Sequence, residues 1–112
     1  MKNRRTCSRI ELNVPLDVDT PHNFYEGHAT DIGVGGLFVA TRYLLEEDRE
    51  VTLNVRLPGE DPMKLTGIVA WRREHEDSEG PVGYGVQFVD LDGNARGAID
   101  RFVARRTPER PG

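Results

Sequence analysis

The sequence contains little of the chemistry on which disulfides, zinc sites and membrane anchors depend. Cys7 is the single cysteine, so no disulfide can form within the chain. The histidines His22, His28 and His75 lack the spacing of zinc ligands. No run of about eighteen apolar residues is present, which predicts no transmembrane helix. No apolar stretch follows the basic first residues, which predicts no signal peptide. These absences favour a cytoplasmic protein.

Groups suited to catalysis are equally scarce. Cys7 lies among arginines, but no histidine stands at a spacing that predicts a base for its thiol. Acidic residues are numerous, yet no pair of them marks a strand end. Gly33 and Gly35 are not followed by the Lys-Ser/Thr pair of a Walker loop or by the helix of a Rossmann fold. The sequence therefore predicts neither an enzyme nor a cofactor or metal site.

Charge is distributed unevenly along the chain. The 112 residues include 15 basic and 19 acidic side chains, for a net charge of −4. Residues 1–9 carry Lys2, Arg4, Arg5 and Arg9 and no acidic residue, which leaves 11 basic and 19 acidic side chains for the rest. Nucleic-acid binding requires a broad positive surface. A basic arm on an acidic body predicts instead a local site for an anion.

Apolar and polar residues alternate over six segments, which is the pattern of half-buried strands. In the first segment, Pro15 marks a sheet edge or a bulge. In the fifth, the alternation places Trp71 on the same face as Leu65 and Val69. The turns between segments are rich in glycine, proline and polar residues. The predicted strands are residues 10–19, 24–30, 37–41, 51–57, 63–71 and 82–88.

The period changes to that of a helix after the sixth strand. Apolar residues then recur at helical spacing over residues 93–106, after an N-cap at Asp92 and before Pro108. Six short strands and one closing helix predict a mainly β protein, a six-stranded antiparallel barrel with a C-terminal α-helix. We expect residues 1–9 to form a flexible basic arm, residues 10–106 the barrel and helix, and residues 107–112 a frayed tail.

Two segments are candidates for binding an anionic ligand. Arg5 and Arg9 are four residues apart just before the first strand, and guanidinium groups bind phosphate bidentately and stack on flat bases. Residues 31–36 contain three glycines, which permit positive φ and close approach of a ligand to the backbone. Asp31 offers an acceptor for the N–H donors of guanine. A solubilising tail and a tight β-turn beginning at Asp31 are the alternative interpretations.

Taken in order, four short motifs resemble the PilZ domain family. The sequence RTCSR at residues 5–9 matches R-x-x-x-R, and DIGVGG at residues 31–36 is similar to D/N-x-S-x-x-G except at Gly33. GIVAW at residues 67–71 looks like the G-x-V-x-W strand of the family, and GYGVQF at residues 83–88 looks like its G-x-G-V-x-F strand. The resemblance covers residues 4 to 104 and includes the trailing helix.

This resemblance implies a PilZ-type barrel that binds cyclic di-GMP, a bacterial second messenger. It implies that Arg5 and Arg9 contact phosphates and guanine edges, that Asp31 accepts hydrogen bonds from a guanine, and that Gly36 keeps the barrel surface clear. Some members have an arginine at the position of Arg4, where it favours a stacked pair of ligands. The implied ligand set is therefore Arg4, Arg5, Arg9, Asp31, Gly33 and Gly36.

Gly33 is the departure from the family pattern, which has serine there. Losing one neutral hydrogen bond costs about 0.5–1.5 kcal/mol, or about two- to tenfold in affinity, so we expect weakened binding. Members with degraded motifs act as protein-interaction adaptors without nucleotide. Two hypotheses follow. One is a cyclic di-GMP receptor that changes conformation and signals to an effector protein, and the other is a nucleotide-independent adaptor. Neither involves nucleic acid or membrane, and both leave the oligomeric state open.

Overall fold

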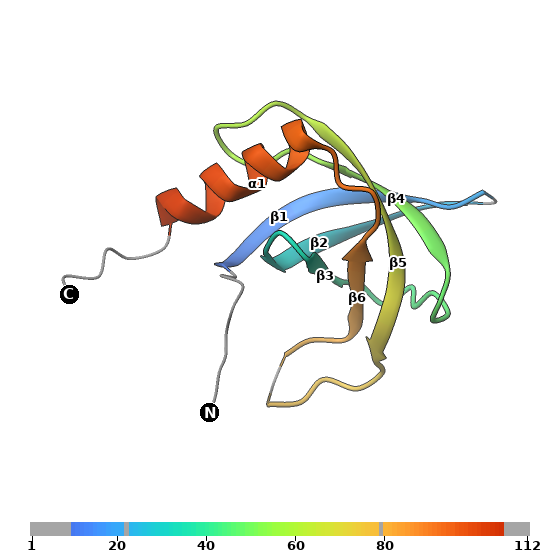
Figure 1. The fold of residues 1–112 in the computed structure, drawn as a ribbon. Helices are drawn as coiled ribbons and strands as arrows, with labels where there is room; N and C mark the ends of the chain where they lie inside the picture. The colour runs from blue at the N-terminus through green and yellow to red at the C-terminus, as the bar shows by residue number, and fades with distance from the viewer. Residues whose placement is uncertain (1–9, 22, 79, 107–112) are drawn as a thin grey trace.

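Six strands close into an antiparallel barrel in the computed structural model, which describes residues 10–21, 23–78 and 80–106. Around the barrel the strands follow the order β1-β2-β3-β6-β5-β4, and a helix follows β6 along the chain (Figure 1). The predicted fold class is confirmed. The elements are β1 (Ile10–Asp19), β2 (Phe24–Ile32), β3 (Gly36–Ala40), β4 (Glu50–Val55), β5 (Met63–Arg73), β6 (Gly83–Phe88) and α1 (Gly93–Arg106).

The helix boundaries agree with the prediction, and the strand boundaries differ by up to two residues. The Asp92 carboxylate accepts a hydrogen bond of 2.8 Å from the amide of Ala95, which confirms the predicted N-cap. β2 continues to Ile32 and β3 begins at Gly36, so the glycine turn between them is shorter than expected. In the described part of the chain, no helix is long and apolar enough to cross a membrane.

The barrel interior is apolar because alternate residues of each strand point inward. The helix adds Ile99, Phe102 and Val103 to the same core, which is how α1 packs against the barrel (Figure 1). Fully buried side chains come from every strand. The largest of them are Tyr84, Phe102, Ile32, Leu37, Leu53, Leu57, Ile99, Val18, Val39, Val51, Val55 and Val69.

Pro15 lies where β1 changes from one neighbouring strand to two. It pairs with His28 of β2, but pairing between β1 and β4 begins only at Leu16. Proline has no N–H to donate to a ladder, so a position with a neighbour on only one side suits it. The predicted sheet edge is therefore confirmed. The pairing of β1 with β2 also shifts register between Glu11 and Val14.

The inward–outward alternation breaks at two further places. In β2 the register against β3 shifts between Ala29 and Asp31, and in β5 the register against β6 shifts between Val69 and Trp71. A β-bulge of this kind inserts one residue and moves the following side chains to the opposite face. Trp71 is consequently 44% exposed on the outside of the barrel. The prediction that it shares the inner face with Leu65 and Val69 was wrong.

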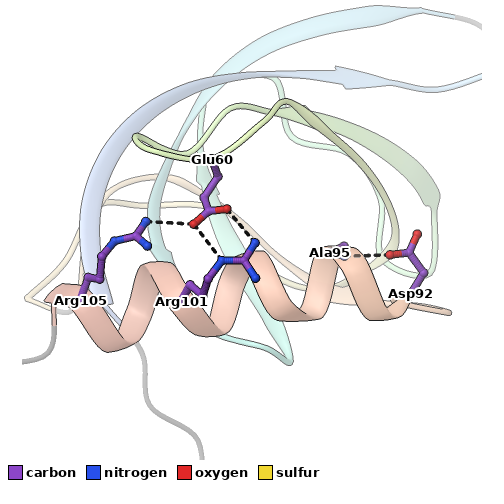
Figure 2. A network of polar contacts seen from close by, with 5 residues as sticks. All are labelled: Glu60, Asp92, Ala95, Arg101 and Arg105. Atoms are coloured by element: carbon purple, nitrogen blue, oxygen red, sulfur yellow. Dashed lines mark hydrogen bonds and ion pairs between the residues drawn. The ribbon is translucent and has the colours of Figure 1, made fainter.

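An ion-pair network fastens α1 to the turn between β4 and β5 (Figure 2). The Glu60 carboxylate, whose side chain is only 7% exposed, accepts hydrogen bonds of 2.9 Å from both Arg101 and Arg105. Gly59, at a φ of 86°, shapes the turn, which a 2.9 Å hydrogen bond from the Glu60 amide to the Leu57 carbonyl closes. The β4–β5 connection thereby places the Glu60 carboxylate within reach of arginines on two successive turns of α1.

Replacing Glu60 with glutamine should loosen α1. Glutamine keeps the size of the side chain but removes the charge that both arginines approach. We expect Glu60→Gln to lower the thermal unfolding midpoint, measured by circular dichroism at neutral pH. Asp61→Asn is the control, since it removes an equal charge from the neighbouring position, and its midpoint should stay near that of the wild type.

The effect of Glu60→Gln should also depend on pH. Hydrogen bonds from Arg101 and then Arg105 lower the pKa of Glu60 from its ordinary 4.5. A carboxyl group with a lowered folded-state pKa stabilises the protein above its unfolded pKa, and that contribution is lost as pH falls through the folded value. The midpoint difference between the two proteins should therefore be largest at neutral pH and shrink below the ordinary value. A difference independent of pH would contradict this assignment.

Candidate functional site

A groove of about 320 Å³ lies on the outer face of the barrel over β3, β6 and the end of β5. Two of the strands beneath it, β3 and β6, contribute glycines to its lining. One carboxylate, one amide and one indole are its functional groups. The residues that line it are Asp31, Gly35, Gly36, Leu37, Phe38, Ala70, Trp71, Gly85, Val86 and Gln87.

Asp31 reaches the groove because of the bulge in β2. Without the bulge, the alternation that buries Gly27 and Ala29 would direct position 31 into the barrel. With it, Ile32 takes the inward place and Asp31 lies opposite Phe38 on the groove side. Asp31 is half-buried at the edge of the groove. A carboxylate is thereby kept at the surface next to an apolar floor.

Trp71 forms one wall of the groove, and Gly85 makes room for it. Trp71 and Gly85 are register partners on β5 and β6, and a Cβ added at Gly85 would overlap the indole ring. The indole therefore lies against the backbone of β6. Its ring centroid is 5.3 Å from that of Phe38, with 34° between the ring planes. Aromatic pairs in such tilted arrangements are favourable, so the exposed indole rests on a buried ring.

Arg73 contacts both of these rings. Its guanidinium carbon lies 4.8 Å from the centroid of Phe38 and 5.1 Å from that of Trp71, both within the range of cation–π attraction. The same guanidinium donates a 3.1 Å hydrogen bond to the carbonyl of Pro81 and forms a 3.5 Å ion pair with Asp77. The loop between β5 and β6 thus fixes Arg73, and Arg73 fixes the aromatic wall.

The glycine turn closes the other side of the groove. The amide of Gly33 donates to the carbonyl of Gly36, and the amide of Phe88 donates to the carbonyl of Gly35, both at 3.0 Å. A Cβ at Gly36 would overlap the carbonyl oxygen of Val86 on the neighbouring strand. Close approach of β3 to β6 is therefore the reason for glycine at this position.

The expected use of positive φ in this turn was wrong. Among the described glycines, those with a left-handed φ are Gly59 and Gly80, which lie in other loops. Glycine is required at position 36 by contact with the adjacent strand and not by backbone conformation. A signal for this was present in the sequence, because Gly83 and Gly85 alternate through the sixth predicted strand and mark a second glycine-lined surface.

The predicted ligand residues separate into three groups. Asp31 and Gly36 line the groove together. Gly33 is buried in the turn beside it and does not line it. Arg4, Arg5 and Arg9 lie outside the described residues, as do Cys7 and His22. Trp71 is a lining residue that sequence reasoning did not assign to the site.

The start of β1 lies beside Asp31 of the groove. Ile10 pairs with Ile32, and Glu11 pairs with Asp31, so the chain enters the barrel beside the groove carboxylate. Among the described residues that line the groove, Asp31 is the one ionisable side chain. In the described part of the chain, no group of three histidine, cysteine or acidic side chains is arranged to bind a metal ion.

A model of the PilZ domain family matches residues 3–105 of this chain. The chain belongs to the PilZ domain family. The match extends over both the residues of the arginine motif and the barrel with its helix. A search of curated proteins found no match.

Three solved structures share the fold at low sequence identity. The inhibitor of motility MotI/DgrA from Bacillus subtilis aligns with a TM-score of 0.78 at 16% identity over 93% of this chain. This chain spans about half of MotI/DgrA, 51% of its length. The PilZ domain of YcgR from Escherichia coli, solved with cyclic di-GMP, aligns at 0.70 with 13% identity, covering 92% of this chain and 91% of that one.

A third relative is the PilZ domain of CeSA from a cellulose-synthesizing bacterium. It aligns with a TM-score of 0.59 at 20% identity, covering 87% of this chain and 95% of that chain. Its alignment is the weakest of the three in TM-score and the strongest in identity. At these identities the three structures support the fold of the barrel.

Substituting Gly36 with alanine should destabilise the barrel at the groove. The added methyl group overlaps the carbonyl of Val86, and overpacking of this kind costs about 1–3 kcal/mol. Gly35→Ala is a matched control, because a Cβ at Gly35 meets nothing within 4 Å. Urea unfolding followed by the fluorescence of Trp71, the single tryptophan, gives both values. Equal stability of the two variants would contradict this role of Gly36.

Proposed function

We propose that this protein is a bacterial, cytoplasmic receptor for cyclic di-GMP that passes the binding signal to a partner protein. The observation that carries the proposal is the convergence of Asp31 and the exposed indole of Trp71 on one groove, beside the start of β1. We assign no catalytic step to the site, since its groups can hold a nucleotide but include no evident nucleophile with a base.

The groove suits a planar base with hydrogen-bond donors on its edge. A guanine presents N1–H and N2–H groups, and the Asp31 carboxylate is an acceptor for such a pair. Gly35, where an added Cβ would meet nothing within 4 Å, leaves the backbone at the edge of the groove open to a flat group. The indole of Trp71 supplies an aromatic face, and stacking of bases on aromatic side chains contributes about 1–3 kcal/mol per base.

Phosphates require cations, which the lining of the groove does not supply. The sequence concentrates Lys2, Arg4, Arg5 and Arg9 in the segment that leads into β1. We assign phosphate and guanine-edge contacts to Arg5 and Arg9, as the family motif implies, because guanidinium groups bind phosphate bidentately. Arg4 would favour a second, stacked ligand. The negative charge of the remaining chain leaves this arm as the part that attracts an anion.

Ligand binding would then connect the arm to the barrel. Ordering a residue costs about 1–2 kcal/mol of backbone entropy, which contacts with the ligand must offset. The resulting change in the surface around β1, β2 and β3 is the signal that a partner protein reads. The receptor therefore needs no movement within the barrel itself.

A nucleotide-independent adaptor is the second candidate, and Gly33 is the observation that favours it. The family serine is absent, and with it one hydroxyl contact to the ligand. Against this candidate, Gly33 is not among the residues that line the groove, and Asp31, Gly36 and Trp71 form the groove without it. We therefore place the receptor first and expect an affinity weaker than that of members with serine.

Titration with cyclic di-GMP tests the proposal. We expect saturable heat in calorimetry and a change in Trp71 fluorescence below about 100 μM, an affinity that corresponds to about −5.5 kcal/mol. Arg5→Ala and Asp31→Asn should each weaken binding by about tenfold or more, since each removes a charge-assisted hydrogen bond. Asp100→Asn, an equivalent change on the exposed side of α1, should bind like the wild type.

Two results of that titration would count against the proposal. If no heat or fluorescence change occurs with the wild type, the protein is not a cyclic di-GMP receptor and the adaptor hypothesis takes its place. If Asp31→Asn and Arg5→Ala bind as well as Asp100→Asn, nucleotide binding stands but the groove is the wrong site.

Restoring the family serine should strengthen binding. Gly33→Ser supplies the missing hydroxyl, and one neutral hydrogen bond is worth about two- to tenfold in affinity. Gly33→Ala is the control for the loss of glycine flexibility without the hydroxyl. If the two variants have the same affinity, position 33 makes no contact with ligand and the weakness attributed to Gly33 is disproved.

A further inference from the structure

The β1–β2 hairpin extends beyond the body of the barrel (Figure 1). In the register of the two strands, Phe24 lies opposite Asp19, and Glu26 lies opposite Asp17. All four side chains point outward, because Leu16 and Val18 are the buried residues of this part of β1. We call these four residues, Asp17, Asp19, Phe24 and Glu26, the hairpin face.

Phe24 is the apolar residue of the hairpin face and lies in its last residue pair before the turn. Its side chain is 57% exposed. It lies on the outer side of the hairpin and therefore contributes little to the core. An exposed aromatic ring offers a large apolar surface to a protein partner. In this case the surrounding residues are carboxylates on both strands.

The carboxylates of the hairpin face repel one another. Like charges directly opposite on neighbouring strands are destabilising, and Asp17 and Glu26 are directly opposite. Within the described residues, neither has an ion-pair partner, whereas Glu60 and Glu74 are both paired with arginines. Asp19 is held by a 3.0 Å hydrogen bond from Asn54 of β4. Arg56 and Lys64 line a hollow together with Asp17, but within the described residues neither forms an ion pair with it, so a cationic partner would relieve this repulsion.

A hollow of about 280 Å³ adjoins the hairpin face and gives a cation a place to enter. Asp19 and Glu50 contribute a carboxylate each, while Pro21 and Val51 contribute apolar surface. A lysine or arginine side chain matches this combination, because its aliphatic stem lies along apolar atoms while its charged end reaches acceptors. The hollow therefore fits a basic side chain in shape, and the hairpin face fits it in charge.

We propose that the hairpin face is the docking surface for a partner protein that presents a basic segment, in which lysine or arginine alternates with apolar residues. An apolar side chain or a cation of that segment covers the ring of Phe24, and its basic side chains approach Asp17, Glu26 and the adjoining hollow. The acidic charge of the face excludes nucleic acid as the occupant. This inference deepens the proposed function, since it gives the chemistry of the partner that the adaptor or receptor contacts.

The hairpin face and the ligand groove lie on different sides of the barrel. The groove lies over β3, β6 and β5, while the hairpin face lies on β1 and β2 with the hollow beside β4. β2 belongs to both regions, with Phe24 at one end and Asp31 at the other. The two regions share no residue, so a partner on the hairpin face does not cover the residues that line the groove.

A fluorescein-labelled peptide of nine residues, in which lysine alternates with leucine, tests the docking surface. Fluorescence anisotropy without nucleotide should give saturable binding to the wild-type chain. The double variant Asp17→Asn/Glu26→Gln should bind about tenfold more weakly. The control Glu46→Gln/Glu47→Gln removes the same charge from the exposed loop between β3 and β4 and should bind as the wild type does.

Phe24→Ser examines the aromatic contact. It should weaken peptide binding about five- to tenfold. Tyr43→Ser should have little effect, because this 62% exposed ring lies 5.9 Å from that of Tyr25, which faces away from Phe24. Absent peptide binding, or equal losses in the hairpin and loop variants, would overturn the proposal. Cyclic di-GMP titration of Asp17→Asn/Glu26→Gln should match the wild type, so failure of the docking surface and failure of the nucleotide site give separate results.

Discussion

The constraint on which this structure depends is the alternation of inward and outward residues in a closed barrel. Every strand pairs with a neighbour on each side in the closed barrel, and a side chain changes faces along a strand where a bulge inserts a residue. Two bulges do this, before Asp31 on β2 and before Trp71 on β5. They bring the carboxylate and the indole to the same outer surface, and the groove exists because of both.

The surface between those two side chains is closely packed. Gly36 and Gly85 bring β3, β6 and the indole to distances that any larger residue would prevent. Phe38 supports Trp71 from below, and Arg73 fixes both rings from the side. A rigid floor lowers the entropy lost when a ligand binds. We therefore expect the barrel to act as a preformed platform, with the positive charge for an anion supplied by residues that precede β1.

The order of elements was predictable from the sequence because it depends on local patterns. The alternation of apolar and polar residues predicted the six strands. Asp92 and the helical spacing of apolar residues predicted both ends of α1 correctly. The outward position of Trp71 was not predictable. A bulge arises from the pairing of two strands, and the sequence of either strand alone contains no signal for it. The reason for Gly36 was missed in the same way, since it depends on Val86 of another strand. The Glu60 network likewise joins residues more than forty positions apart.

Amide and indole chemical shifts on addition of cyclic di-GMP test the central claim, that the two bulges build the nucleotide site. The account predicts that the indole N–H of Trp71 and the amides of Asp31, Gly36 and Gly85 shift in a saturable and concerted manner. The amides of the β4–β5 turn and α1 should stay in place. Saturable shifts confined to other parts of the barrel, with the Trp71 indole unchanged, would contradict it.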